Sequence, residues 1–286
     1  MTALSLRRTR RFGAAACLVA ALAPAAAAAH PADLYYERTL MTAAGARCGL
    51  FEPRVSAALD AAAWQARGAA LRSGADEAAL RQVRARALAK AGAAPCASTD
   101  LKTAAARVKD AFAGWAKVSR MTFPGQAAPW VADRTAYRSA RWKLSQGARV
   151  GFDTVTFGYA GKGEGAALAA VAAFRDGARP YAARLVLRDP TRAAKPWLVK
   201  TGGVPRSALA TVMAEAAAPA EASLANGAET ALAFRFPARA ADRIAALDPR
   251  ESFQIEFLFA DDTVRTARLE VGDFAAGRAF LAMGAL

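Results

Sequence analysis

The chain has 286 residues, and its 39 Lys and Arg residues outnumber its 24 Asp and Glu residues, so the formal net charge is +15. The one histidine, His30, excludes Ser-His-Asp and Cys-His catalysis and any cluster of histidine metal ligands. Hydrophobic residues make up 55% of the chain, and the larger ones recur with regular spacing, which predicts a folded protein rather than a disordered one.

The first 29 residues have the three parts of a secretory signal peptide. Four arginines precede an apolar run over residues 12–22, Pro24 interrupts the run, and five alanines follow it. We expect cleavage near Ala29, a periplasmic or secreted protein, and no transmembrane segment after cleavage. Three alternatives stay open: an uncleaved membrane anchor, a lipid anchor on Cys17, and twin-arginine export. Cleavage removes four arginines and no acidic residue, which lowers the net charge from +15 to +11.

Residues 30–120 are predicted to form a helical region. Apolar residues recur with helical spacing over residues 33–46, from Pro53 to Gly74, and over residues 76–91. Pro53 suits a first helical position, where its missing N–H has no helical partner to lose.

A fourth helix is expected after Cys96. It starts with a polar cap, for which the candidates are Ser98, Thr99 and Asp100. Its apolar stripe has strict helical spacing and consists of Leu101, Ala105, Val108, Phe112 and Trp115. Four amphipathic helices with short connections indicate a small bundle.

Cys48 and Cys96 are the two cysteines that remain once the predicted signal peptide is removed. An isolated pair in an oxidising compartment predicts a disulfide. The alternatives are a redox pair, which normally has C-x-x-C spacing, and a metal site, which needs more than two ligands. A closed loop of this length stabilises a fold by roughly 4 kcal/mol on the chain-entropy model. We expect reduction to loosen the helical region first.

A Pro- and Gly-containing connector is predicted over residues 121–139, followed by a β-rich domain over residues 140–286. Strand-like segments lie at residues 141–145, 150–159, 167–174, 181–188, 197–200, 253–259 and 264–271. Short helices are expected at residues 205–216, 239–247 and 273–282. The predicted fold is α+β: a disulfide-stapled helical bundle, then an antiparallel, sandwich-like domain with short peripheral helices.

The densest basic and aromatic stretch of the chain supplies the candidate binding residues Arg134, Arg138 and Arg141. An anionic partner in the cell envelope, such as lipopolysaccharide, anionic lipid or an acidic protein, would suit these charges. Nucleic acid is not expected as a partner outside the cytoplasm. Plain solvation of a connector explains the same arginines equally well.

Two segments resemble functional motifs. The GKGEG sequence at residues 161–165 lacks the G-x-G-x-x-G spacing of a dinucleotide site, so a glycine-rich hairpin is the better interpretation. Asp261 and Asp262 are adjacent turn residues whose carboxylates point apart into water. The chain has no G-x-S-x-G or S-x-x-K motif. We therefore expect no catalytic residues, no cofactor and no metal, although widely separated glycosidase carboxylates leave no local pattern.

The C-terminal half of the chain resembles the end of invasion-associated locus B-like proteins. The resemblance rests on Phe234-Arg-Phe236-Pro, on Ala246-Leu247-Asp248, on the two strand segments that follow, and on the segment from Gly272 to Leu281. It covers residues 140–286 and implies an exported, β-rich protein with a role at the envelope or in host-cell invasion. The chain departs from this family because it has no cysteine after Cys96 and carries additional helices.

These observations predict an exported, non-enzymatic protein with a binding or structural role in the cell envelope. Two alternatives stay open. A small-ligand-binding protein of the periplasm needs a well-formed pocket. A carboxylate-based hydrolase of cell-wall glycans needs a cleft with two acids roughly 5–9 Å apart.

Overall fold

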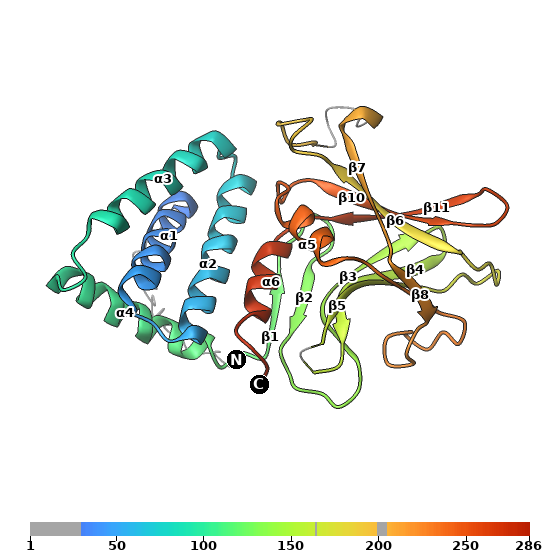
Figure 1. Ribbon diagram of the computed structural model, residues 1–286, viewed down its shortest axis with the longest axis horizontal. Helices are drawn as coiled ribbons and strands as arrows, with labels where there is room; N and C mark the ends of the chain where they lie inside the picture. The colour runs from blue at the N-terminus through green and yellow to red at the C-terminus, as the bar shows by residue number, and fades with distance from the viewer. Residues whose placement is uncertain (1–29, 164, 199–204) are drawn as a thin grey trace, which may run out of the picture.

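Figure 1 shows the computed structural model, in which a helical region lies beside two β-sheets. The structure describes residues 30–163, 165–198 and 205–286, so the predicted signal peptide lies outside the described residues. Four helices followed by antiparallel sheets confirm the predicted α+β class. Within the described ranges, no helix combines the length and the apolar character that a bilayer crossing requires.

The helical region follows the predicted boundaries closely. Its helices are α1 (Pro31–Cys48), α2 (Pro53–Arg72), α3 (Glu77–Ala93) and α4 (Thr99–Trp115). Ser98 is the N-cap of α4, since its hydroxyl accepts a hydrogen bond from the N–H of Leu101. Asp76 caps α3 in the same way, and the His30 ring accepts from the N–H of Ala32 at the start of α1. These caps satisfy N–H groups that the helices themselves leave without partners.

The predicted disulfide between Cys48 and Cys96 is confirmed. The two Cα atoms lie 5.5 Å apart, within the ordinary range for a bridge. Cys48 ends α1, and Cys96 lies in the connection from α3 to α4. Arg47 donates to the carbonyl of Ala94 beside the bridge. The end of α1 is therefore tied to the connection that follows α3.

Two antiparallel sheets form the rest of the molecule. The seven-stranded sheet has the order β1-β2-β3-β4-β5-β9-β8, and the four-stranded sheet has the order β11-β10-β6-β7. The strands of the larger sheet are β1 (Arg120–Phe123), β2 (Trp130–Asp133), β3 (Arg141–Val150), β4 (Asp153–Gly161), β5 (Ala167–Ala172), β8 (Ala216–Pro219) and β9 (Leu232–Arg235). Those of the smaller are β6 (Ala182–Arg188), β7 (Leu209–Met213), β10 (Ser252–Leu258) and β11 (Val264–Glu270). The helices α5 (Ala238–Ala245) and α6 (Phe274–Leu281) complete the order.

Three sequence predictions differ from this topology. The predicted connector over residues 121–139 contains most of β1 and all of β2, so it is part of the larger sheet. The helix predicted at residues 205–216 is wrong. A single 3-10 turn is followed by β7, which forms a strand because it pairs with β6 and buries Val212 opposite Leu185. Trp197 and Leu198 lie outside any strand, and the rest of the segment predicted at residues 197–200 lies outside the described residues.

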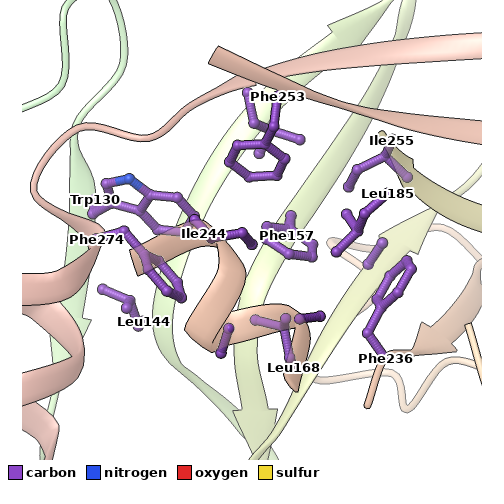
Figure 2. Close-up of a cluster of buried hydrophobic side chains, with 14 of the residues drawn as sticks. Trp130, Leu144, Phe157, Leu168, Leu185, Phe236, Ile244, Phe253, Ile255 and Phe274 are labelled. Atoms are coloured by element: carbon purple, nitrogen blue, oxygen red, sulfur yellow. The ribbon is translucent and has the colours of Figure 1, made fainter. Parts of the chain in front are cut away.

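The inner faces of the two sheets pack against each other around aromatic side chains (Figure 2). Phe157 of β4 meets Phe253 of β10 with ring centroids 5.5 Å apart, and Leu185 of β6 belongs to the same fully buried cluster. The Trp130 indole N–H donates to the carbonyl of Val271 at 2.9 Å, which satisfies its polar atom inside the core. The predicted sandwich-like packing is thus present.

The helical region shares this core. Ala58 and Ala61 of α2 are fully buried in the same cluster as the sheet residues, and α2 lies against α6 (Figure 1). At this contact Arg72 binds both carboxylate oxygens of Asp273, at 2.6 and 2.9 Å. Burial raises the pKa of Asp273 even though Arg72 opposes the shift. The carboxylate therefore depends on Arg72 as its partner.

Candidate functional site

The structure separates the three arginines that the sequence grouped as a candidate site. Arg134 is only 2% exposed. Its guanidinium donates to the carbonyls of Gly284 at 2.7 Å, Val118 at 3.1 Å and Met283 at 3.3 Å, and it lies 5.0 Å from the Phe280 ring centroid. The interpretation of Arg134 as a solvated connector residue is therefore wrong.

The other two arginines remain on the surface. Arg138 and Arg141 are exposed, and Arg141 lies over the Tyr137 ring at 5.4 Å. Lys143, from the same basic stretch, is buried and donates to the carbonyl of Thr135 at 2.6 Å. A shallow cavity of about 260 Å³ borders Arg134 and Lys143, but both side chains already have protein partners. The stretch mostly supports the fold.

The two motif-like segments are turns, as expected. β4 and β5 pair antiparallel on either side of the GKGEG sequence, so the glycines form a hairpin connection. Asp261 lies in the β10–β11 hairpin, where its carboxylate accepts hydrogen bonds from the N–H and the hydroxyl of Thr263. These contacts hold the pKa of Asp261 below its ordinary value. Both motif-like sequences therefore lie in connections between antiparallel strands, and neither needs a ligand to account for it.

A groove of about 480 Å³ lies between α1, α2 and α3, with the end of α5 closing one side. We call it the helical groove. Its polar and aromatic lining consists of Tyr35, Thr39 and Thr42 from α1, Asp60, Trp64 and Arg67 from α2, and Glu77, Arg81 and Arg84 from α3. Alanine and leucine side chains complete the walls. It is the best candidate for a functional site among the described residues.

Helical spacing brings these side chains together. On each helix the three lining residues are four and then three positions apart, so they share one face. This face is the sequence signal that could have identified the groove. Each of these residues, taken alone, also suits a solvent-facing helix surface, and only the packing of the three helices turns the faces toward one another.

Polar contacts order the interior of the groove. Arg67 binds Glu77 with 2.7 Å between guanidinium nitrogen and carboxylate oxygen, and its guanidinium carbon lies 5.7 Å from the Trp64 ring centroid. The Trp64 indole N–H donates to the Asp60 carboxyl group. The hydroxyls of Thr39 and Tyr35 are also hydrogen-bonded to each other. The Arg67–Glu77 ion pair links α2 to α3, whereas the other contacts lie within single helices.

Burial changes the acidity of two groups in the groove. It raises the pKa of Asp60, and the hydrogen bond from Trp64 offsets this only in part. It also raises the pKa of Tyr35, although the positive charges of Arg67 and Arg84 oppose the shift. Asp60 is therefore a carboxylate that the fold partly buries without an ion-pair partner among the described residues. A carboxyl group whose pKa is shifted by burial inside a cavity is a candidate functional residue.

The rim of the groove on α3 is basic. Arg81 and Arg84 are exposed, and no acidic group of the described residues lies within ion-pair distance of either. Residues 78–99 also contain Arg86 and Lys90 and have no acidic residue. The rim therefore presents uncompensated positive charge beside a partly apolar cavity.

Two carboxyl groups line the helical groove, Asp60 on α2 and Glu77 on α3, and Glu77 is paired with Arg67. The described residues also hold no group of three or more potential metal ligands.

Comparisons with protein-family models, with curated proteins and with solved structures found no match to this chain.

Proposed function

We propose that the protein is an exported, non-enzymatic binding protein that holds a small ligand in the helical groove. The observation that carries this proposal is the convergence of polar side chains from three helices on one cavity, with Asp60 and Trp64 at its wall. Small-ligand sites have the same character: a largely apolar cavity of about 300–1,000 Å³ with a few oriented polar groups.

The cost of the arrangement supports a functional role. A half-buried carboxyl without an ion-pair partner lowers the stability of the folded state at neutral pH. If position 60 only had to fill space between the helices, alanine or leucine would do so without the cost of a partly buried charge. Proteins retain such destabilising groups chiefly where activity needs them.

Export is the second part of the proposal. It is supported by the signal-peptide pattern of residues 1–29 and by a disulfide that suits an oxidising compartment. The resemblance of residues 140–286 to invasion-associated locus B-like proteins supports the same location. N-terminal sequencing of the protein from the periplasm or medium is expected to give a start at or near His30, whereas a start at Met1 in a membrane fraction would contradict export.

A fragment screen tests the groove. Protein-observed NMR of the mature chain with a library of polar fragments is expected to shift amide signals of α1, α2 and α3 facing the groove. Ala46→Trp places a large side chain at the groove rim from an exposed position, so it should remove these shifts. Ala85→Trp is the matched control, because Ala85 is exposed on α3 and does not line the groove.

The two tryptophan variants distinguish binding in the helical groove from binding elsewhere. Fragment shifts that disappear in Ala46→Trp and persist in Ala85→Trp support a binding site in the helical groove. Fragments that bind only elsewhere, or equally well to both variants, overturn it. Release of reducing ends from peptidoglycan by the mature chain, lost in Asp60→Asn, would instead favour the hydrolase alternative.

A further inference from the structure

The helical groove contains partners for a ligand of a particular chemistry. The Asp60 carboxyl group accepts hydrogen bonds, and so does the Thr42 hydroxyl, whose own proton is donated to the carbonyl of Arg38 at 2.8 Å. The Tyr35 hydroxyl lines the same groove and can both donate and accept. A ligand that satisfies these groups must both donate and accept, and hydroxyl groups do both.

The rim adds a requirement for negative charge. Arg81 and Arg84 are three residues apart on α3, so their side chains emerge on one face about 5–6 Å apart. Neither has an acidic partner among the described residues. Two adjacent guanidinium groups form charge-assisted hydrogen bonds with carboxylate or phosphate oxygens, often in a bidentate manner.

The walls between these groups are apolar and partly flat. The half-buried Trp64 and the small side chains of Ala43 and Ala63 line the groove beside these polar groups. The non-polar face of a sugar ring packs well on such a surface, because it presents C–H groups while its hydroxyls point outward.

We infer that the helical groove binds a sugar that carries an anionic group, with its hydroxyls at Asp60 and its carboxylate or phosphate at Arg81 and Arg84. This inference rests on the proposed function, since it names the ligand class of the same groove. The hydroxyls of such a ligand would satisfy the polar groups inside the groove, and its anionic group would pair with the arginines at the rim. A single ligand with both features accounts for polar groups and arginines lining the same groove.

Matched sugars test the charge requirement. NMR titrations of the mature chain compare glucuronate and galacturonate, which carry a carboxylate, and glucose 6-phosphate, which carries a phosphate, with neutral glucose and galactose. At least one anionic sugar should bind about tenfold or more tightly than its neutral counterpart, the effect of one charge-assisted hydrogen bond. The carboxylate and phosphate arms show which anion the rim prefers.

Arginine variants locate the anion. The double variant Arg81→Gln/Arg84→Gln changes two exposed side chains, so it should fold normally and bind the anionic sugar no better than the neutral one. Arg86→Gln is the control, since Arg86 is exposed on the same helix but does not line the groove. Binding should also weaken as salt is added, because rim charges are screened.

The failures of the two proposals differ. If fragments occupy the groove in an Ala46-dependent manner but no anionic sugar exceeds its neutral counterpart, the ligand class is wrong and the binding function stands. If anionic sugars bind equally well to the Arg81→Gln/Arg84→Gln variant, the placement of the anion is wrong. If neither fragments nor sugars occupy the groove, both proposals fall.

Discussion

Arg134 joins the segment after α6 to the beginning of the larger sheet. Its four carbonyl acceptors, on Ala116, Val118, Met283 and Gly284, come from residues that follow α4 and α6, so one side chain holds two distant parts of the chain. Arg134 and Met283 are both buried. Arg134 therefore has a structural role, which is independent of any ligand that the exposed Arg138 and Arg141 bind.

Arg134→Gln is expected to destabilise the fold by about 2–3 kcal/mol, because a glutamine amide cannot reach all four carbonyls and loses the buried charge-assisted contact with Met283. Arg138→Gln, at an exposed position in the same stretch, should change the free energy of unfolding by less than about 0.5 kcal/mol. Urea unfolding of the two variants measures the difference. Equal effects would contradict the structural role of Arg134.

Asp60 makes a pH-dependent contribution to stability. Burial raises its pKa in the folded state above the unfolded value of about 3.9, so the folded protein holds the proton more tightly. The ionised group therefore lowers stability at neutral pH, and this cost disappears as the pH falls below the unfolded pKa. An asparagine at this position keeps an acceptor for the Trp64 N–H without the charge.

Asp60→Asn should consequently raise the free energy of unfolding at pH 7 and leave it unchanged near pH 3.5. The measurement is urea unfolding at both pH values. Asp110→Asn, at an exposed position on α4, provides the comparison for the general effect of removing one negative charge. A gain of equal size at both pH values would show that the effect does not come from the buried charge.

At the level of elements, sequence patterns predicted best those segments whose apolar residues repeat over several turns. α4 and the β10–β11 hairpin have regular stripes, and both form where expected. β1 and β2 have four residues each, too few for an alternation to be distinguished from a loop. The alanines around β7 favour a helix by propensity, but pairing with β6 makes this segment a strand.

The candidate site was less predictable than the fold. Arg134 and Arg141 are close in sequence, which predicts a common surface, but Arg134 follows β2 and is buried against the segments after α4 and α6, whereas Arg141 begins β3 and is exposed. The polar and aromatic residues of the groove come from three helices and are up to 49 positions apart, between Tyr35 and Arg84. Local sequence carries no information on which helix faces meet, because that depends on how α1, α2 and α3 pack.

Gly68 sets the approach of α2 to α6. A Cβ atom at this position would lie 2.0 Å from the Asp273 carboxylate, and Arg72 holds that carboxylate in place. Gly68→Ala should therefore separate the buried ion pair and destabilise the fold by about 3 kcal/mol or more. Gly92→Ala is the control: it is exposed in α3 with open space around it, and it should stabilise by about 0.5–1 kcal/mol. Thermal unfolding of the two variants should shift in opposite directions, and a shared direction would contradict this account.

At the scale of the whole described structure, the main core of the sandwich extends into α2, and the helical region has two smaller apolar clusters of its own. Ala58 and Ala61 of α2 belong to the sandwich cluster, and Trp115 of α4 contacts Phe280 of α6 with ring centroids 6.2 Å apart. Separating the helical region from the sheets would expose these surfaces and leave Asp273 without Arg72. The sequence had suggested two parts joined by a connector, but the connector supplies strands of the sheet and the parts share their apolar interior.

This shared core predicts a single unfolding transition, with or without the disulfide. Reduction of Cys48–Cys96 should lower the melting temperature by about 10 °C, since the loss of roughly 4 kcal/mol corresponds to that shift in a protein of this size. Calorimetry should give equal calorimetric and van't Hoff enthalpies in both redox states. Far-UV circular dichroism and the fluorescence of buried Trp130 should also report the same midpoint, because helices and sandwich unfold together. Earlier melting of the helices after reduction, as the sequence alone suggested, would show that the contact between α2 and α6 is too weak to couple the two regions.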